Sequence, residues 1–216
     1  LLCARSRDSR AWASALLRDS TDGAAGSGRA SKTYRALLVP GVLPLAPGQS
    51  LPVAVPIGRG RHRRLGEIWC ARRSASSSER AGALRARSRI TLLERRGEAD
   101  LVEVSIATGR PHQIRIHCAA VGAPLLGDPL YRPGGGVNGD GLPGEGGYRL
   151  HAHRLRLLRP DGSLLELEAV PPQDLLRAEE RIQVAATQSG GPAKSLLSRP
   201  GRGCSGVEDL RLEDRG

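Results

Sequence analysis

The spacing of hydrophobic positions changes abruptly near the middle of the chain. Over residues 101–106 every second side chain is apolar, and this period of two predicts a strand. From residue 112 the apolar positions Ile114, Cys118 and Val121 are three or four apart, as on one face of an amphipathic helix. We therefore expect a strand that is followed closely by a short helix.

The residues between and after these segments predict where each element ends. Thr108 and Gly109 interrupt the alternation, and Pro111 suits a first helical position because its missing N–H would have no partner there. Gly122 and Pro124 then stop the helix. The turn and the two ends of the helix are thus all predicted from local sequence.

The remaining pattern predicts few helices, several strands and long loops. Residues 150–158 and 164–170 flank a Pro-Asp-Gly turn and predict a β-hairpin. A helix is expected over residues 8–18. Residues 133–147 are rich in glycine and predict a long loop, with a flap beside a substrate as one role for it.

The length of the chain suits one domain followed by a tail. Of the 216 residues, we assign residues 1–176 to one domain with a core based on Leu, Val and Ala, because there is no Phe or Met. Residues 177–216 lack an apolar period toward their end, and we expect this tail to be disordered.

Positive charge is concentrated in one part of the chain. The net charge is +11, and residues 59–96 hold twelve arginines against three glutamates. Coding bias toward arginine explains part of this, but a cationic surface also attracts phosphate backbones. No apolar run approaches the length that spans a membrane, so RNA is the expected partner. The expected RNA-binding arginines of this segment are Arg59, Arg61, Arg63 and Arg64.

Cysteine and histidine spacing gives little support to a metal site. The four cysteines form no C-x-x-C pair, which suits a reducing compartment. A zinc site built from His112, His117, His151 and His153 is conceivable, but His112 and His117 are five apart and do not share one helical face. We expect no metal and no cofactor.

One long string resembles a known family. Residues 108–117 read TGRPHQIRIH and residues 127–131 read GDPLY, which together resemble the RluA-type RNA pseudouridine synthases, particularly their plant-like members. Residues 31–39 are similar to that family's K-x-Y-x-A strand, and residues 148–155 to its L-H-A strand. Residues 55–59 resemble the segment that opens its variable middle. The resemblance covers roughly residues 1–175 in the expected order.

The resemblance implies a fold and a reaction. The expected fold is α+β, with a mixed, mainly antiparallel sheet, a central active-site cleft and its first strands missing from this chain. Such enzymes isomerise a uridine within an RNA chain by breaking its N-glycosidic bond, turning the base and rejoining it through carbon. An aspartate acts as the nucleophile and no cofactor is needed.

The same resemblance assigns roles to individual residues. Tyr34 matches the tyrosine that packs against the target base, and Arg115 matches the arginine that pairs with the nucleophilic aspartate. Arg110, His112 and Gln113 are expected to contact RNA, although bonds to loop backbone are an equal alternative. Asp128 looks like a turn former rather than a substitute nucleophile.

The family's H-R-L-D-x-x-T-S-G motif, which carries the nucleophile, does not occur in the 216 residues. We expect it immediately upstream of Leu1, in the missing part of a longer protein. The alternative is an RNA-binding relative that cannot catalyse the reaction. The expected partner is tRNA or rRNA, the protein is expected to be monomeric, without membrane attachment, and its compartment is expected to be intracellular, in the cytoplasm or an organelle.

Overall fold

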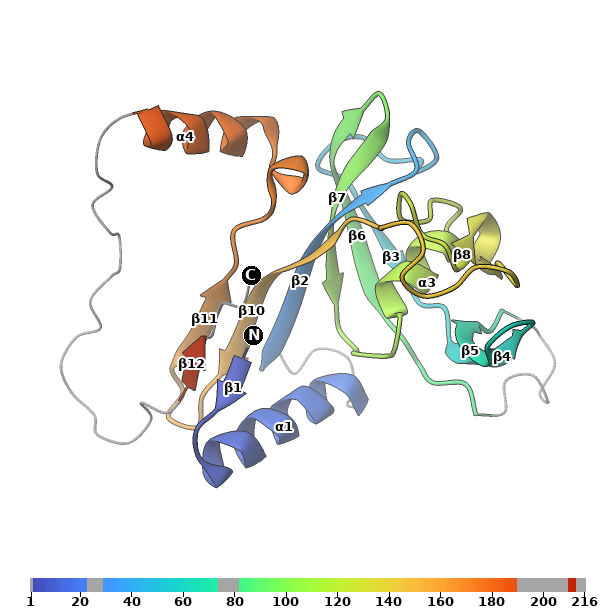
Figure 1. Cartoon of the computed structure of the whole chain (residues 1–216). Helices are drawn as coiled ribbons and strands as arrows, with labels where there is room; N and C mark the ends of the chain where they lie inside the picture. The colour runs from blue at the N-terminus through green and yellow to red at the C-terminus, as the bar shows by residue number, and fades with distance from the viewer. Residues whose placement is uncertain (1, 23–28, 74–81, 190–209, 213–216) are drawn as a thin grey trace.

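An antiparallel sheet of six strands organises the molecule (Figure 1). In spatial order its strands are β11, β10, β2, β7, β6 and β3, and every neighbouring pair is antiparallel. This agrees with the expected α+β class and its mainly antiparallel sheet. The strands are β2 (Ala30–Leu38), β3 (Ser50–Val53), β6 (Ser88–Arg96), β7 (Ala99–Ile106), β10 (Leu150–Leu158) and β11 (Leu164–Glu168).

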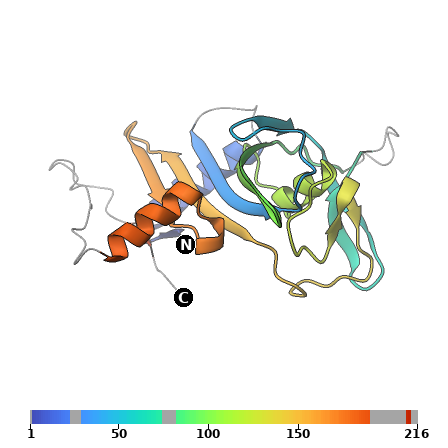
Figure 2. The same cartoon turned by 90° about the horizontal axis from the view of Figure 1, so that it is seen from above.

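The structure is a computed structural model that describes residues 2–22, 29–73, 82–189 and 210–212. Beside the sheet lie helices α1 (Arg7–Asp22), α3 (Gln113–Ala120) and α4 (Ala178–Ser189) and the 3₁₀ turns η1 (Pro133–Gly135) and η2 (Gln173–Leu175). The small hairpins and pairs are β1 (Leu2–Ala4) with β12 (Leu210–Leu212), β4 (Ile57–His62) with β5 (Gly66–Ala71), and β8 (Tyr131–Arg132) with β9 (Gly136–Val137). Seen from above, α4 and the β4–β5 hairpin lie at opposite ends of the molecule, with the large sheet between them (Figure 2).

The main core lies between one face of the sheet and α3. Alternate residues of each strand point to this face, among them Ala36 and Leu38 of β2, and Ile114 and Cys118 of α3 pack against them. Val121 is partly buried on the same cluster. The predicted apolar stripe of the helix is therefore confirmed, and it fixes which face of α3 is left for polar groups.

Several predicted elements are confirmed closely. The alternating segment 101–106 forms the last six residues of β7, and the segments around the Pro-Asp-Gly turn form the antiparallel β10–β11 hairpin. The N-terminal helix is longer than predicted, because α1 continues to Asp22. Gly122 follows α3 with a φ of 91°, a conformation that suits glycine and ends the helix.

The structure differs from the expected disorder at the start of the tail. Residues 178–189 form α4, whose first N–H, at Ala178, donates to Glu94 on β6 at 2.6 Å. Arg35 of β2 reaches the same helix through an ion pair with Glu180 at 3.0 Å. These contacts with the sheet stabilise a helix whose own apolar period is weak. The expectation for residues 190–209 and 213–216 lies outside the described residues.

None of the helices in the described ranges is long and apolar enough to cross a membrane.

Candidate active site

A buried polar network holds the start of α3 against the sheet. The Gln113 side chain donates to the Arg87 carbonyl oxygen at 2.8 Å and to Ser88 Oγ at 3.0 Å. Its Oε1 accepts from Thr108 Oγ1 at 2.7 Å and from the Arg110 N–H at 3.0 Å. Because all these bonds are internal and Gln113 is buried, the geometry favours a structural role over contact with RNA.

His117 extends this network on the next turn of α3. Its Nε2 lies 2.9 Å from the Val55 carbonyl oxygen, and its Nδ1 lies 2.8 Å from Ser88 Oγ. A carbonyl can only accept, so Nε2 carries the proton and Nδ1 accepts from Ser88. Desolvation lowers the pKa of His117 from its ordinary 6.5, against an opposing effect of the Val55 bond. The imidazole is therefore neutral at pH 7.

The lowered pKa of His117 predicts a loss of stability in mild acid. The unfolded chain takes up a proton near pH 6.5, whereas the folded chain keeps His117 neutral to lower pH. The free energy of unfolding should therefore be level above pH 6.5 and fall as pH drops below that value. Urea denaturation at a series of pH values measures this.

The matched control is His117→Gln, which cannot titrate in this range. This variant should be less stable at neutral pH but should show a shallower decline with acid. Equal slopes for the two proteins would contradict the prediction for His117.

His112 immediately precedes α3 in an unusual backbone conformation. Its φ of 55° and ψ of 17° make it the one non-glycine residue with positive φ among the described residues. Such strain costs on the order of 1–3 kcal/mol and concentrates at functional sites. The Tyr131 hydroxyl donates to the Trp69 carbonyl oxygen at 2.8 Å, so its oxygen accepts the His112 Nδ1–H at 2.7 Å. The imidazole ring of His112 is exposed, and its Nε2 atom is therefore left to accept a hydrogen bond from a ligand at the surface.

The pKa of His112 also lies below its ordinary value. Desolvation is the main cause, and the positive charge of Arg115 adds to it, while Asp128 acts in the opposite direction. At neutral pH His112 therefore presents an uncharged imidazole, with an acceptor at Nε2 rather than a cation.

Arg115 makes the central ion pair of this region. Its Nε donates to Asp128 Oδ2 at 2.7 Å and its Nη2 to Asp128 Oδ1 at 2.6 Å, the parallel pair of bonds that a guanidinium forms with a carboxylate. The two side chains are only 7% and 0% exposed. The Asp128 carboxylate also accepts the N–H groups of Leu130 and Tyr131, so it is both a turn former and the partner of Arg115.

Two tyrosine rings hold the guanidinium of Arg115. Its carbon lies 4.3 Å from the ring centre of Tyr148 and 4.9 Å from that of Tyr131, distances suited to cation–π attraction. The pKa of Arg115 is raised: desolvation opposes the charge, but the bonds and charge of Asp128 outweigh it. Its Nη1 has no hydrogen-bond partner in the described part of the chain.

The glycine-rich loop of residues 133–147 packs closely against the loop that carries Asp128. Gly127 has a φ of 79°, and a Cβ there would lie 3.0 Å from the Gly147 carbonyl oxygen. At Gly141 a Cβ would overlap the carbonyl oxygen of Pro129. Short β8 and β9 pair within the same region. The loop therefore forms one wall around the Arg115–Asp128 pair.

We expect Gly141→Ala to destabilise the protein by about 2 kcal/mol, since the Pro129 backbone cannot move without shifting the Asp128 turn. Thermal and urea denaturation measure the effect. Gly147→Ala is the control in the same loop, because a Cβ there meets no atom within 4 Å. Equal losses in the two variants would contradict this packing.

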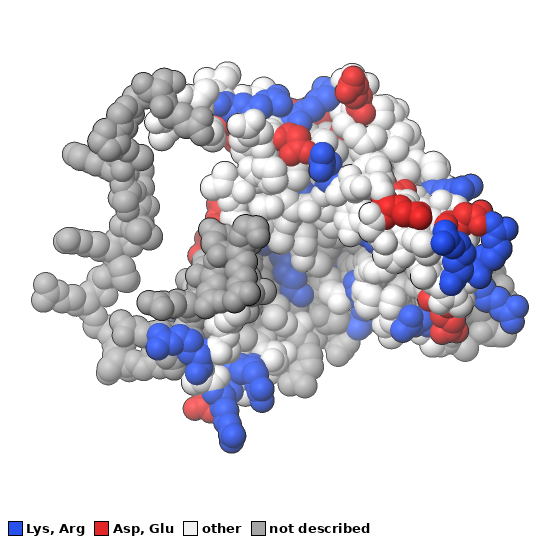
Figure 3. All heavy atoms as spheres, viewed as in Figure 1, with Lys and Arg blue, Asp and Glu red and all other residues white. Residues whose placement is uncertain are grey.

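The expected RNA-binding arginines gather on the β4–β5 hairpin and its turn. Arg59 and Arg61 are exposed on one face of β4, and the Arg59 guanidinium carbon lies 4.2 Å from the ring centre of Trp69 on β5. Arg61 faces Glu67 across the hairpin. Basic side chains are prominent at this end of the molecule (Figure 3).

The other two arginines lie at the hairpin turn beside the glycine-rich loop. Arg63 forms an ion pair with Asp140, and Arg64 donates to the Asp140 carbonyl oxygen at 3.2 Å. His62, buried below them, donates from Nε2 to the Asn138 carbonyl oxygen at 2.9 Å. Part of this charge is therefore neutralised within the protein, whereas Arg59 and Arg61 are the more available pair.

Arg110 lies at a different place from the hairpin. It is half-buried in the turn before α3, and its Nε donates to the Arg85 carbonyl oxygen at 3.0 Å. This bond to loop backbone is one of the two roles that the sequence left open for it.

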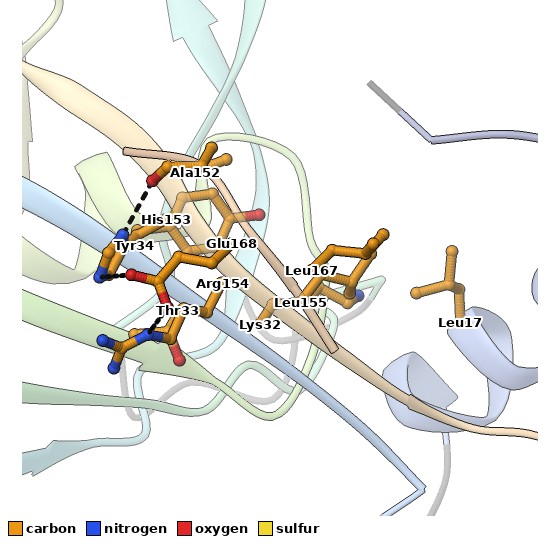
Figure 4. Close-up of a pocket in the computed structure, with 11 residues that line it drawn as sticks. Leu17, Lys32, Thr33, Tyr34, Ala152, His153, Arg154, Leu155, Leu167 and Glu168 are labelled. Atoms are coloured by element: carbon orange, nitrogen blue, oxygen red, sulfur yellow. Dashed lines mark hydrogen bonds and ion pairs between the residues drawn. The ribbon is translucent and has the colours of Figure 1, made fainter. Parts of the chain in front are cut away.

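Tyr34 opens onto a cavity of about 370 Å³ between α1, β2 and the β10–β11 hairpin (Figure 4). Its ring is half-buried against the main core, and burial raises the pKa of its hydroxyl, so the phenol is protonated at neutral pH. Arg115 does not line this cavity. The residues that line the cavity include Leu17, Lys32, Tyr34, Ala152, Leu155 and Leu167.

The sequence did not identify Asp128 and Tyr148 as partners of Arg115. Asp128 lies 13 positions from Arg115, and its neighbours Gly127 and Pro129 suggested only a turn. Tyr148 stood out only as the residue before an L-H-A string. The one available signal was that both lie inside strings that resemble the same family as the string carrying Arg115.

The histidines do not converge on a metal site. His117 and His112 are each bonded as described, whereas His151 Nε2 and His153 Nδ1 both lie within 3.1 Å of the Ala169 carbonyl oxygen. Within the described ranges, no group of three or more His, Cys, Asp and Glu side chains could hold a metal ion.

Comparison with known proteins identifies the class. The sequence model of the family described as RNA pseudouridylate synthase matches residues 1–120. The chain therefore belongs to the RNA pseudouridylate synthase family.

Curated relatives are longer than this chain. An RNA pseudouridine synthase of Synechocystis sp. is 36% identical over 160 residues, which are 73% of this chain and 51% of that protein. RNA pseudouridine synthase 5 of Oryza sativa subsp. japonica is 32% identical over 227 residues, which cover 88% of this chain and 54% of that one. The chain thus spans about half the length of these relatives.

A solved structure shares the fold. Human RNA Pseudouridylate Synthase Domain Containing 1 superposes with a TM-score of 0.54 and 21% identity, covering 88% of this chain and 75% of the human chain. The α+β fold with its mainly antiparallel six-stranded sheet thus matches that of a solved pseudouridine synthase domain.

Proposed function

We propose that this chain is part of the catalytic domain of an RNA pseudouridine synthase, and that its nucleophile is an aspartate from a segment outside these 216 residues. The observation that carries the proposal is the buried, doubly bonded Arg115, which keeps Nη1 free of protein partners in the described part of the chain. A guanidinium fixed by one carboxylate can bind a second one through that nitrogen and keep it ionised.

The proposed reaction needs an ionised nucleophile and no external reactant. The N1–C1′ bond of a uridine breaks, the base turns, and a C5–C1′ bond forms. C5 loses a proton and N1 gains one, so the product is an isomer of the substrate. Arg115 would hold the attacking carboxylate in its charged form, which is the form that can act as a nucleophile.

Tyr34 would pack against the base of the target uridine. The open cavity beside its ring and the protonated state of its hydroxyl support this role. A base can enter such a cavity only after leaving its stack, a step that costs a few kcal/mol in a duplex and less in a loop.

The substrate would be a structured RNA, either tRNA or rRNA, held in part by the arginines of the β4–β5 hairpin. A relative with 32% identity over 129 residues is named ribosomal large subunit pseudouridine synthase D, from Neisseria meningitidis. Arg110 and the exposed ring of His112, at the start of α3, are proposed to contact the RNA as well, with Gln113 supporting them from within. We further propose a monomeric protein within the cell that uses no cofactor.

The experiment that tests the origin of the nucleophile is to sequence the transcript upstream of the codon for Leu1. An in-frame H-R-L-D-x-x-T-S-G motif would support the proposal. An initiator codon with no such aspartate before Leu1 would leave an RNA-binding relative that cannot isomerise uridine.

A further inference from the structure

Lys32 stands apart from the other cationic side chains of this protein. It is the only lysine in the described residues, in a chain with 33 basic residues of which two are lysines. It lies two positions before Tyr34 on β2, so both side chains point to the same face of the sheet. Both also line the same cavity.

Lys32 lacks a neutralising partner in the part of the chain that the structure describes. It forms no hydrogen bond or ion pair with any residue in the ranges that the structure describes. Its side chain is half-buried, and desolvation alone lowers the pKa of its ammonium group from the ordinary 10.5. The lysine side chain is thus partly desolvated beside the apolar residues of the cavity, without a counter-charge among the described residues, which is unfavourable for an ammonium group.

Lys32 lies beside apolar side chains, and the acidic side chain of the same cavity is already paired with another residue. Leu155 and Leu167 lie beside it, and Leu17 of α1 faces them across the cavity (Figure 4). The acidic residue that lines the cavity is Glu168, whose carboxylate accepts from Arg154 Nε at 2.9 Å. That bond also lowers the pKa of Glu168. The cavity therefore carries one unpaired positive charge at Lys32.

We propose that the Lys32 ammonium binds a backbone phosphate of the substrate RNA next to the nucleotide whose base packs against Tyr34. This inference rests on the proposed function and adds a specific anchor to it. A nucleotide carries a flat base with an apolar face and, a short distance away, an anionic phosphate. The cavity carries the matching groups, which are the ring of Tyr34 and the ammonium of Lys32. Lysine suits a phosphate oxygen as a compact point charge with three donors.

The proposed role of Lys32 differs from that of the arginines on the β4–β5 hairpin, which would attract RNA through their exposed charge. The hairpin arginines are exposed and would contact the backbone at a distance from the reacting base. Lys32 would instead fix the phosphate beside the flipped nucleotide, so its loss should affect binding of a single-stranded uridine oligomer as well as of a long RNA.

The test uses the protein translated from the complete reading frame, with a short single-stranded oligouridylate as the probe, titrated over a range of salt concentrations. Lys32→Gln should weaken binding about tenfold near 0.1 M salt. It should also reduce the slope of log affinity against log salt by about 0.7, the value for one phosphate contact on a single strand. Lys32→Arg should keep the slope, because it keeps the charge.

Two further variants distinguish binding from a structural role. Lys32→Leu should raise the melting temperature, since it removes an unpaired charge from an apolar wall, while it weakens binding as much as Lys32→Gln. Arg156→Gln is the control on the neighbouring strand: Arg156 is paired with Glu166 and opposes Ser31 in the sheet. It should leave both affinity and slope unchanged.

A probe with one uncharged methylphosphonate linkage identifies the phosphate. The uncharged linkage is placed at each position of the oligomer in turn. At one of these positions the wild-type protein should bind the probe more weakly than the unmodified oligomer, whereas Lys32→Gln should bind the two equally. A Lys32→Gln protein with the affinity and slope of the wild type would overturn the inference and leave the proposed function standing. In a competition assay, inorganic phosphate is compared with unlabelled oligomer at the same phosphate concentration. If inorganic phosphate displaces the labelled oligouridylate as effectively as the unlabelled oligomer does, Lys32 binds any anion, and that result would also overturn the inference. A wild-type protein that binds no oligouridylate at any salt concentration would overturn both.

Discussion

Replacing Arg115 with methionine should lower the free energy of unfolding by about 3 kcal/mol and abolish isomerisation. The variant leaves the carboxylate of Asp128 buried without its ion-pair partner, and breaking one side of a buried pair is strongly destabilising. The remaining bonds from the N–H groups of Leu130 and Tyr131 cannot supply a counter-charge. Urea denaturation measures the loss in stability.

A double-mutant cycle with Asp128→Asn provides the control. Because both substitutions remove the same interaction, the double variant should be more stable than the sum of the two single losses predicts. Arg115→Lys should recover part of the stability, since it keeps the charge, but little catalysis, since it loses the parallel bonds. Additive losses in the cycle would contradict the pairing of these two residues.

Neutralising Arg59 and Arg61 together should give the largest loss of RNA affinity among double arginine variants. Neither has a carboxylate partner at ion-pair distance in the described part of the chain, and both are exposed on one face of β4. Replacing both with glutamine should reduce the slope of log affinity against log salt by about 1.4, and affinity near 0.1 M salt by roughly 25-fold. Filter binding of an unstructured RNA over a salt series measures both quantities.

The charge-matched control is Arg156→Gln with Arg177→Gln, which removes the same charge elsewhere. These arginines are already paired with Glu166 and Glu179, and the structure places them away from the hairpin. The control should change the slope much less than the hairpin variant. Equal changes would show that only net charge, and not the hairpin, directs binding.

Local patterns predicted the elements well where each pattern has a single structural solution. The alternation before the Pro-Asp-Gly turn and after it could form only a hairpin, and β10 and β11 pair as expected. The change from a period of two to one of three or four located β7 and α3. α4 was missed because its stability comes from Glu94 and Arg35 on distant strands rather than from its own sequence.

The sequence predicted individual residues of the candidate site but not the ion pair between Arg115 and Asp128. The resemblance selected Arg115 and Tyr34 from the chain, yet it could not show that Asp128 already occupies the guanidinium of Arg115. The surrounding residues suggested a turn, and the structure shows that one carboxylate performs both tasks. For Gln113 the sequence left contact with RNA and bonds to loop backbone as equal alternatives, and the structure shows four internal hydrogen bonds that no local spacing reveals.

The most direct test of the proposed function is release of tritium from RNA that carries uridine labelled at C5. The bond from C5 to hydrogen breaks only when the base is rejoined through carbon, so release reports the isomerisation itself. The protein translated from the complete reading frame should release tritium from a structured RNA without added cofactor, and Arg115→Lys should release far less. A complete, folded protein that binds the RNA but releases no tritium from tRNA or rRNA substrates would contradict a pseudouridine synthase and leave an RNA-binding relative.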